Sequence, residues 1–208
     1  MAKQHRTGAG SKHVSDKADM VIRRDATKPG SHISTDQWVS RLPGRLPNTY
    51  GREQMDQRYH GGTLFFDHYS GYIHVHCQVS LRIGETLEGK HAFERFAKQY
   101  GVKLEHFRAD NNPFNAEEWR ADLESQDQTC SLSGVGAHHQ NGTAERALQT
   151  VTYWARAMMM HQLLHWPDCF NANLWPFALE HAVHLWNHLR GTVTDSLLLS
   201  CSLERSNL

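Results

Sequence analysis

A glycine-rich polar loop that runs into a long amphipathic helix is the feature that most constrains this chain of 208 residues. The segment 133–160 reads SGVGAHHQNGTAERALQTVTYWARAMMM. Asn141 and Thr143 are both good N-cap residues, so we expect a helix to begin near Ala144. Glu145 then lies in the first turn, where unpaired backbone N–H groups favour a negative charge. Apolar residues recur behind it at three- and four-residue steps, which predicts one buried face.

A second acidic residue, Asp110, lies 35 positions upstream of Glu145, at the end of a strand-like run at 102–110. An Asn-Asn-Pro turn signal follows it. An acid at the end of a strand and another at the start of a helix can converge at one edge of a sheet. Carboxylate oxygens are the ligands that Mg²⁺ and Mn²⁺ prefer, so the pair suggests a divalent-metal site. The alternative is that Glu145 merely offsets the helix dipole.

These segments resemble the integrase core of retroelements, specifically that of copia-type long-terminal-repeat retrotransposons. The matching segments are Asp110-Asn111 with Phe114, GVGAHHQNGTAER at 134–146, ARAMM at 155–159 and LWPFALEHAVHLWNHL at 174–189. Two acids at this spacing are a weak signal, because the chain holds 22 Asp and Glu residues. The acids together with the HHQNG loop and the AER helix start are specific. The resemblance covers about residues 29–189.

The remaining segments alternate between strand-like and helix-like patterns. In chain order we expect a strand at 32–39, a hairpin of 64–67 and 72–79, a helix at 84–101, a strand at 102–110, a helix at 115–125, a strand at 128–132, the long helix, and a last helix at 174–189. This order predicts an α/β fold. The resemblance implies a ribonuclease-H-like mixed sheet of five strands flanked by helices.

The third carboxylate of such a site has two candidates, Asp36 and Asp67. Asp67 stands in a hydrophobic strand, but it lies two residues before the hairpin turn, where aspartate commonly stabilises the turn. In the family, the first catalytic acid lies on the strand before the hairpin, and PGSHISTDQWVSRLPGRL at 29–46 resembles that strand. The resemblance therefore favours Asp36, with Asp67 kept as the alternative.

The resemblance implies that Asp36, Asp110 and Glu145 are the catalytic acids and hold two Mg²⁺ or Mn²⁺ ions. Two such ions about 3.5–4 Å apart can activate the attacking oxygen and stabilise the leaving oxygen of an in-line phosphodiester displacement. The implied reactions are 3′-end processing of the element's DNA and strand transfer into target DNA. Asn111 would position Asp110. The residues implied to contact or order DNA are His138, His139, Gln140, Asn141 and Arg146.

Charge is divided unevenly along the chain, although the net charge is zero. Residues 1–58 carry a net charge of +5, and residues 59–208 carry a net charge of −5. We expect a basic disordered arm or linker at 1–30, the integrase core at 31–189 and an aberrant tail at 190–208. A basic arm suits phosphate contacts, and a solvated tail is the plain alternative.

Two segments near the ends depart from an intact element. AKQHRTG at 2–8 resembles the stretch that follows the small His/Cys zinc module of relatives, so we expect the chain to start just after that module. At the other end, RGTVTDSLLLSCSLERSNL replaces the family's proline-rich continuation. Codons for 196–207 can be chosen that spell TPAELFTGAIK in a shifted frame. We therefore hypothesise a frameshifted tail.

Cysteine spacing and hydropathy favour a soluble protein without a zinc site. The four cysteines form no C-x-x-C pair, so we expect reduced, mostly buried thiols. No apolar run approaches the length of a membrane span, and no secretory signal is evident. We expect no membrane contact and an intracellular location, nuclear in a working element. His181, His184 and His188 share a helix face at metal-ligand spacing, but we expect an ordinary face because ligation needs further ligands.

Three functions remain open. The first is a DNA integrase core, a metal-dependent polynucleotidyl transferase that binds DNA and works as a homo-oligomer. The second is a catalytically dead DNA-binding relic of a transposable element, which the unusual tail favours. The third is a ribonuclease-H-like nuclease, which the HHQNGTAER segment disfavours.

Overall fold

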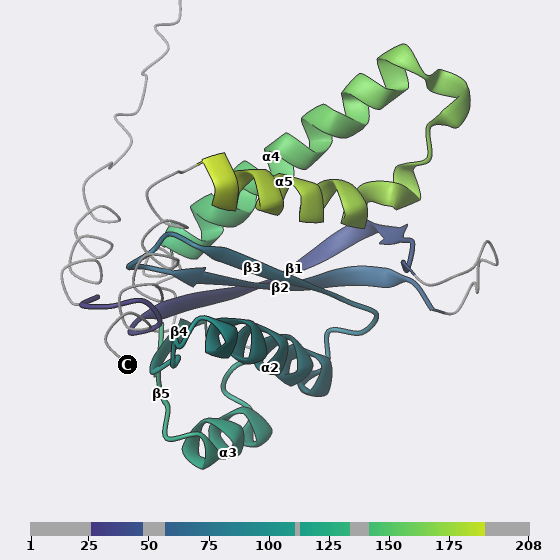
Figure 1. The fold of residues 1–208 in the computed structure, drawn as a ribbon. Coiled ribbons are helices and arrows are strands. Elements are labelled where there is room, and N and C mark those ends of the chain that lie inside the picture. Colours follow the sequence, from purple (N-terminus) through teal and green to yellow (C-terminus); the bar gives the residue numbers. More distant parts are fainter. Residues whose placement is uncertain (1–25, 48–56, 111–112, 134–141, 190–208) are drawn as a thin grey trace, which may run out of the picture.

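The computed structural model describes residues 26–47, 57–110, 113–133 and 142–189 (Figure 1). The expected tail at 190–208 and most of the expected arm at 1–30 lie outside these residues. The elements are β1 Ile33–Gly44, β2 Tyr59–Asp67, β3 Ile73–Gln78, α2 Ile83–Gln99, β4 His106–Ala109, α3 Glu117–Ser125, β5 Thr129–Leu132, α4 Gly142–His165, the 3-10 turns η2 Pro167–Cys169 and η3 Ala172–Leu174, and α5 Trp175–Leu189. No helix in the described ranges is long and apolar enough to cross a bilayer.

The five strands form one mixed sheet in the order β3-β2-β1-β4-β5. β2 pairs antiparallel with both β1 and β3, whereas β4 pairs parallel with both β1 and β5. The predicted hairpin is β2 and β3, and the predicted helices all form. α2, α3 and α5 begin and end within two residues of the expected positions, and α4 continues to His165, beyond the segment considered in the sequence. The expected five-stranded mixed sheet flanked by helices is confirmed.

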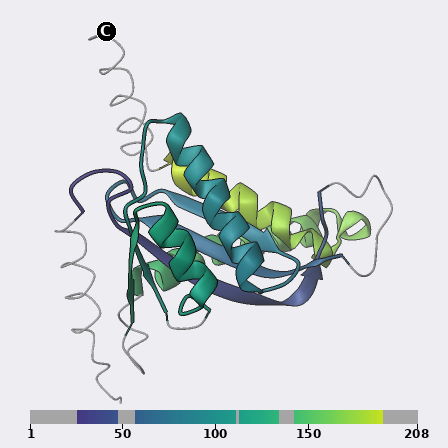
Figure 2. The ribbon, with the colours of Figure 1, turned by 90° about the horizontal axis from the view of Figure 1, so that it is seen from below.

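Helices cover both faces of this sheet. α4 and α5 lie on one face and α2 and α3 on the other (Figure 1), and Figure 2 shows α2 and α3 from their own side. β2 supplies both cores, because Leu64 and Phe66 pack with α4 and α5 while Phe65 packs with α2 and α3. Successive side chains of a strand point to opposite faces, so a central strand covered on both sides is apolar throughout.

β1 is longer than its sequence pattern indicates. It continues to Gly44, five residues beyond the expected end and through the Pro-Gly turn signal. Residues far along the chain hold this extension: Trp175 Nε1 donates to the Leu42 carbonyl at 2.9 Å, and Arg45 N donates to the Asn173 carbonyl at 2.7 Å. The extension therefore depends on contacts that local sequence does not reveal.

β4 is shorter than expected and covers only the second half of the predicted strand at 102–110. Val102 N donates to the Ala97 carbonyl at the end of α2, and Glu105 N donates to the Gly30 carbonyl. These backbone N–H groups form hydrogen bonds with residues that do not belong to neighbouring strands. The first half of the predicted strand is therefore a connection.

The expectation of mostly buried thiols is wrong for one of the three cysteines in the described ranges. Cys77 is buried, Cys130 is half-buried and Cys169 is exposed. Burial raises the pKa of the Cys77 thiol to about 12. Cys169 is exposed because it lies in the surface turn η2, which follows α4.

A buried cation joins α2 to α3. Lys90 is fully buried, and its Nζ lies 2.6 Å from both Glu94 Oε1 and Asp122 Oδ2. His91 Nε2 lies 2.7 Å from the second oxygen of Asp122. Burial by itself would raise the pKa of Asp122, but the hydrogen bonds and charges of Lys90 and His91 together hold it below its ordinary value. Loss of either carboxylate leaves the buried ammonium group underpaired, so the cluster stabilises the packing of α3 on α2.

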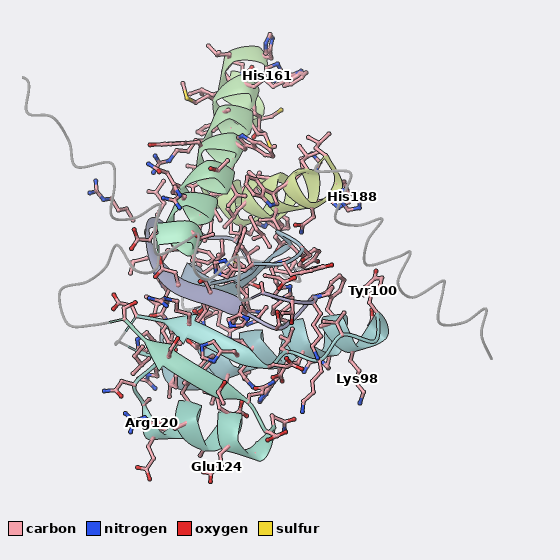
Figure 3. All side chains as sticks on the ribbon, turned by 90° about the vertical axis from the view of Figure 1, so that its left-hand side faces the viewer. Lys98, Tyr100, Arg120, Glu124, His161 and His188 are labelled. Atoms are coloured by element: carbon pink, nitrogen blue, oxygen red, sulfur yellow. The ribbon has the colours of Figure 1, made fainter. Side chains whose placement is uncertain are left out.

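Asp122→Asn should lower the free energy of unfolding at neutral pH by about 1–3 kcal/mol, because a buried cation loses a charged partner. The stabilising contribution of the Asp122 carboxylate is fully present above its ordinary pKa of 3.8 and is lost as the pH falls through the lowered pKa. The free energies of unfolding of the two proteins should therefore converge in acid. Urea unfolding at several pH values measures both effects. Glu124→Gln is the control, since Figure 3 shows Glu124 pointing away from the sheet on the same helix. Equal losses in the two variants would contradict the role of the cluster.

Candidate active site

Small side chains anchor the first turns of α4 on the sheet. α4 begins at Gly142, two residues before the expected start, and Glu145 lies in its first turn as predicted. The buried residues of the helix are Gly142, Thr143, Ala144, Ala147, Val151 and Ala155. The alanines and Val151 pack in the same core as Leu64 of β2. Glu145 itself is exposed, at the margin of this contact.

Asp36 lies in β1 on the face of the sheet that α4 covers. It stands opposite Leu64 in the antiparallel ladder, and Leu64 belongs to the core beneath α4. Directly opposite residues of such a ladder share one face of the sheet. Asp36 is half-buried, and its Oδ1 accepts a hydrogen bond from Gln37 N at 2.9 Å.

Asp110 lies one strand away from Asp36. β1 and β4 run parallel, and Ser34 of β1 is the register partner of Arg108 of β4. These two residues are 74 positions apart, which is also the separation between Asp36 and Asp110. Asp110 directly follows the last residue of β4. The ladder between β1 and β4 ends at the pair of Ser34 and Arg108, two residues before Asp36 and Asp110.

Asp36 and Glu145 line the same open pocket, which has a volume of about 490 Å³. Its other lining residues are Arg146, Leu148, Gln149, Thr152, Tyr153 and Arg156, all from α4. The structure thus brings two of the predicted acids together with Arg146, a predicted DNA contact. Asp110 is not one of the described residues that line this pocket.

The donor chemistry of this pocket fits Mg²⁺ or Mn²⁺, because carboxylate oxygens are hard ligands. The geometry does not yet form a full ligand set, because no three His, Cys, Asp or Glu side chains in the described part of the chain lie close enough together to hold a metal ion. The expected ligand set of Asp36, Asp110 and Glu145 is therefore only partly assembled. The expected residues His138, His139, Gln140, Asn141 and Asn111 lie outside the described ranges.

Asp67, the alternative first acid, lies on the opposite face of the sheet. It stands opposite Ile33, which belongs to the core beneath α2 and α3. Its carboxylate accepts hydrogen bonds from Gly30 N at 3.2 Å, from Ser70 N at 3.0 Å and from the Ser70 hydroxyl. Burial raises the pKa of Asp67, although these hydrogen bonds act in the opposite direction. The expectation that Asp67 stabilises the hairpin turn is confirmed.

Three lining residues of the pocket, Gln149, Tyr153 and Arg156, are absent from the site expected from the sequence. They follow Glu145 at steps of four, four and three residues, which is the spacing of one helical face. Gln149 Nε2 donates to the Tyr153 hydroxyl at 3.1 Å. The same periodicity that revealed the apolar face of this helix, applied to its polar residues, would have found them.

No protein family model matches the chain, and no curated protein sequence matches it. Solved structures do match. The HTLV-2 integrase catalytic core domain in complex with magnesium, in its dimeric form, has a TM-score of 0.51 and 20% identity over 77% of this chain and 88% of its own. The catalytic core domain of BIV integrase has a TM-score of 0.50 and 13% identity over 75% of this chain and 82% of its own.

A chain of the simian T-cell lymphotropic virus intasome in complex with PP2A regulatory subunit B56 gamma has a TM-score of 0.52 and 14% identity. The match covers 76% of this chain and 48% of that chain. The fold is that of retroviral integrase catalytic cores. The ribonuclease-H-like fold implied by the sequence is thereby confirmed, whereas the copia type stays a prediction.

Asp67→Ala should lower the free energy of unfolding by about 1–3 kcal/mol, because it leaves buried backbone N–H groups of Gly30 and Ser70 without an acceptor. Asp36→Ala should cost about 1 kcal/mol at most, because the Asp36 carboxylate borders an open pocket where water can replace its contacts. Urea unfolding followed by circular dichroism compares the two. A larger loss for Asp36→Ala would mean that Asp36 is the structural carboxylate.

Proposed function

We propose that this domain is an integrase-type DNA strand transferase core, a metal-dependent polynucleotidyl transferase of a copia-type retroelement. The observation that carries the proposal is the pocket shared by Asp36 and Glu145, with Asp110 directly after the neighbouring strand β4. Acidic side chains gathered from a strand and a helix are the groups that a metal-dependent phosphodiester displacement requires. The proposed reactions are 3′-end processing of element DNA and strand transfer into target DNA.

Asp36, Asp110 and Glu145 are proposed to hold two Mg²⁺ or Mn²⁺ ions. Bound there, the ions would supply charge for the attacking and leaving oxygens of the phosphodiester. Oxygen donors suit these hard cations, and the HTLV-2 integrase core was solved in complex with magnesium. The contribution of the protein is to hold the acids at positions on β1, directly after β4 and on α4, because each of these elements is packed in a core.

DNA is the proposed partner of the pocket. Arg146 and Arg156 border it and would attract phosphate groups, and Tyr153 exposes about half of its surface on the same helix face, where a base can stack. The proposed DNA contacts in the preceding loop are His138, His139, Gln140 and Asn141, and Asn111 is proposed to position Asp110. These assignments follow the resemblance, and Arg146 is the member of the set that lines the pocket.

A homo-oligomer is proposed as the working form. The HTLV-2 core was solved in dimeric and trimeric forms, and the simian virus chain belongs to an intasome. We assign the core to 31–189, with a basic arm at 1–30 that reaches DNA and a frameshifted tail at 190–208. A working copy would act in the nucleus, where its target DNA lies.

A catalytically dead DNA-binding relic is the second candidate. The observation that favours it is the incomplete ligand set, since the described side chains include no close group of three metal donors. Arg146 and Arg156 would still bind phosphate in such a protein. It should therefore bind DNA in a salt-sensitive manner without turnover.

Strand transfer on a labelled DNA duplex, with Mg²⁺ or Mn²⁺, tests the first candidate. Asp36→Asn, Asp110→Asn and Glu145→Gln should each slow the reaction by at least about 100-fold, because each removes a charge that stabilises the transition state through the ions. Asp67→Asn is the matched control, since it makes the same chemical change on the opposite face of the sheet. It should retain activity when corrected for the folded fraction.

The other outcomes of this assay separate the alternatives. Activity that is lost in Asp67→Asn and kept in Asp36→Asn would assign the first acid to Asp67. A folded, unmodified chain that binds DNA without any turnover would support the relic. Preferential cleavage of an RNA–DNA hybrid over DNA ends would indicate the nuclease.

A further inference from the structure

α5 presents three histidines on one exposed face. His181, His184 and His188 are all exposed and follow each other at steps of three and four residues, which places them on one side of the helix. The ring centroids of His184 and His188 lie 3.9 Å apart, and those of His181 and His184 lie 6.2 Å apart. Figure 3 shows His188 at the outer end of α5, away from the sheet. None of these side chains belongs to the acidic pocket.

The hydrogen bond made by His188 sets its tautomer. Its Nδ1 lies 2.7 Å from the backbone carbonyl oxygen of His184. A carbonyl oxygen can only accept, so Nδ1 carries the proton and Nε2 of the neutral ring keeps its lone pair. Metal-binding histidines typically have this arrangement, in which one ring nitrogen donates to a carbonyl and the other is the ligand. His188 is therefore oriented as a ligand before any ion is bound.

We propose that His184 and His188 form a chelating site for a divalent transition ion of the Cu²⁺, Ni²⁺ or Zn²⁺ class. Imidazole nitrogen suits these ions, and two histidines four residues apart on a helix are a known ligand spacing. Two nitrogens bound to one tetrahedral Zn²⁺ lie about 3.3 Å apart, which follows from bond lengths near 2.05 Å. The ring centroids lie 3.9 Å apart with the ring planes inclined by 32°, so one ion can bridge the two rings after side-chain rotation.

The site supplies two protein ligands. No close group of three metal donors occurs among the residues that the structure describes, so water completes the coordination and the ion exchanges readily. The ion bridges one turn of α5 near its C-terminal end and stabilises that turn, because the folded helix alone holds the two rings together. The proposal does not depend on the proposed function, since its ligands are chemically unlike the carboxylates of the pocket.

α4 provides an internal comparison. His161 and His165 have the same four-residue spacing, are exposed, and have ring centroids 4.2 Å apart. Figure 3 shows His161 on α4, well separated from His188. This second pair can bind the same ions by the same ligand chemistry. It must be removed separately for the α5 site to be measured.

Calorimetric titration of the full chain with CuCl₂, NiCl₂ or ZnCl₂ tests the site, in a background of His161→Ala and His165→Ala. His188→Ala should weaken the remaining tightest site by about 100-fold, because the close four-residue pair is lost and the rings of His181 and His184 lie 6.2 Å apart. His181→Ala is the matched control, since it removes an exposed histidine from the same face while leaving the pair intact. It should leave the affinity unchanged, and circular dichroism verifies that each variant is folded.

Histidine modification provides a site-resolved readout that does not require activity. Bound Cu²⁺ should protect His184 and His188 from diethyl pyrocarbonate, as read by mass spectrometry of peptides, and Mg²⁺ should give no protection. Equal loss of affinity in His181→Ala and His188→Ala would overturn the proposal. Unprotected His184 and His188 in the presence of saturating Cu²⁺ would overturn it as well.

Discussion

Close packing between the first turns of α4 and the β1–β2 ladder is the constraint on which the site depends. Ala144 and Ala147 are almost fully buried against the same core as Leu64. Small side chains let a helix approach a sheet closely, and a larger residue at either position would push the helix outward. Asp36 lies opposite Leu64, so the width of the pocket between Asp36 and Glu145 follows from this contact. The geometry of this pocket is therefore a consequence of alanine packing.

Strand alternation decides which acids can meet. Asp36 stands opposite Leu64 on the α4 side, whereas Asp67 stands opposite Ile33 on the α2 side. A one-residue slip of the β1–β2 register would exchange the two faces, so the register selects the acid. Large side chains on the α2 side, including Phe65 and the buried Lys90, hold β1 and its neighbours in place. One face of the sheet thus provides rigidity, and the other carries the acids.

The sequence predicts most of this fold because the hairpin and the helices have local signals. The extension of β1 could not be predicted, since Trp175 bonds to Leu42 across 133 positions. Residue patterns alone could not decide between Asp36 and Asp67, because both lie in strands. Only strand pairing shows which face of the sheet each residue occupies. The three acids of the proposed site were predicted from the resemblance to integrase motifs. Arg156 could have come from helical spacing, but a polar helix face ordinarily signifies only solvent contact.

Two donor sets of different chemistry lie on the neighbouring helices α4 and α5. Figure 1 shows that the first turn of α4, which carries Glu145, and the end of α5, which carries His188, lie at the same end of the helix pair. Ligand type separates them, because carboxylates suit hard Mg²⁺ while imidazoles suit Cu²⁺, Ni²⁺ and Zn²⁺. Since Mg²⁺ has little affinity for imidazole, millimolar Mg²⁺ would not displace a transition ion from the proposed α5 site. The two proposed sites would therefore take different ions.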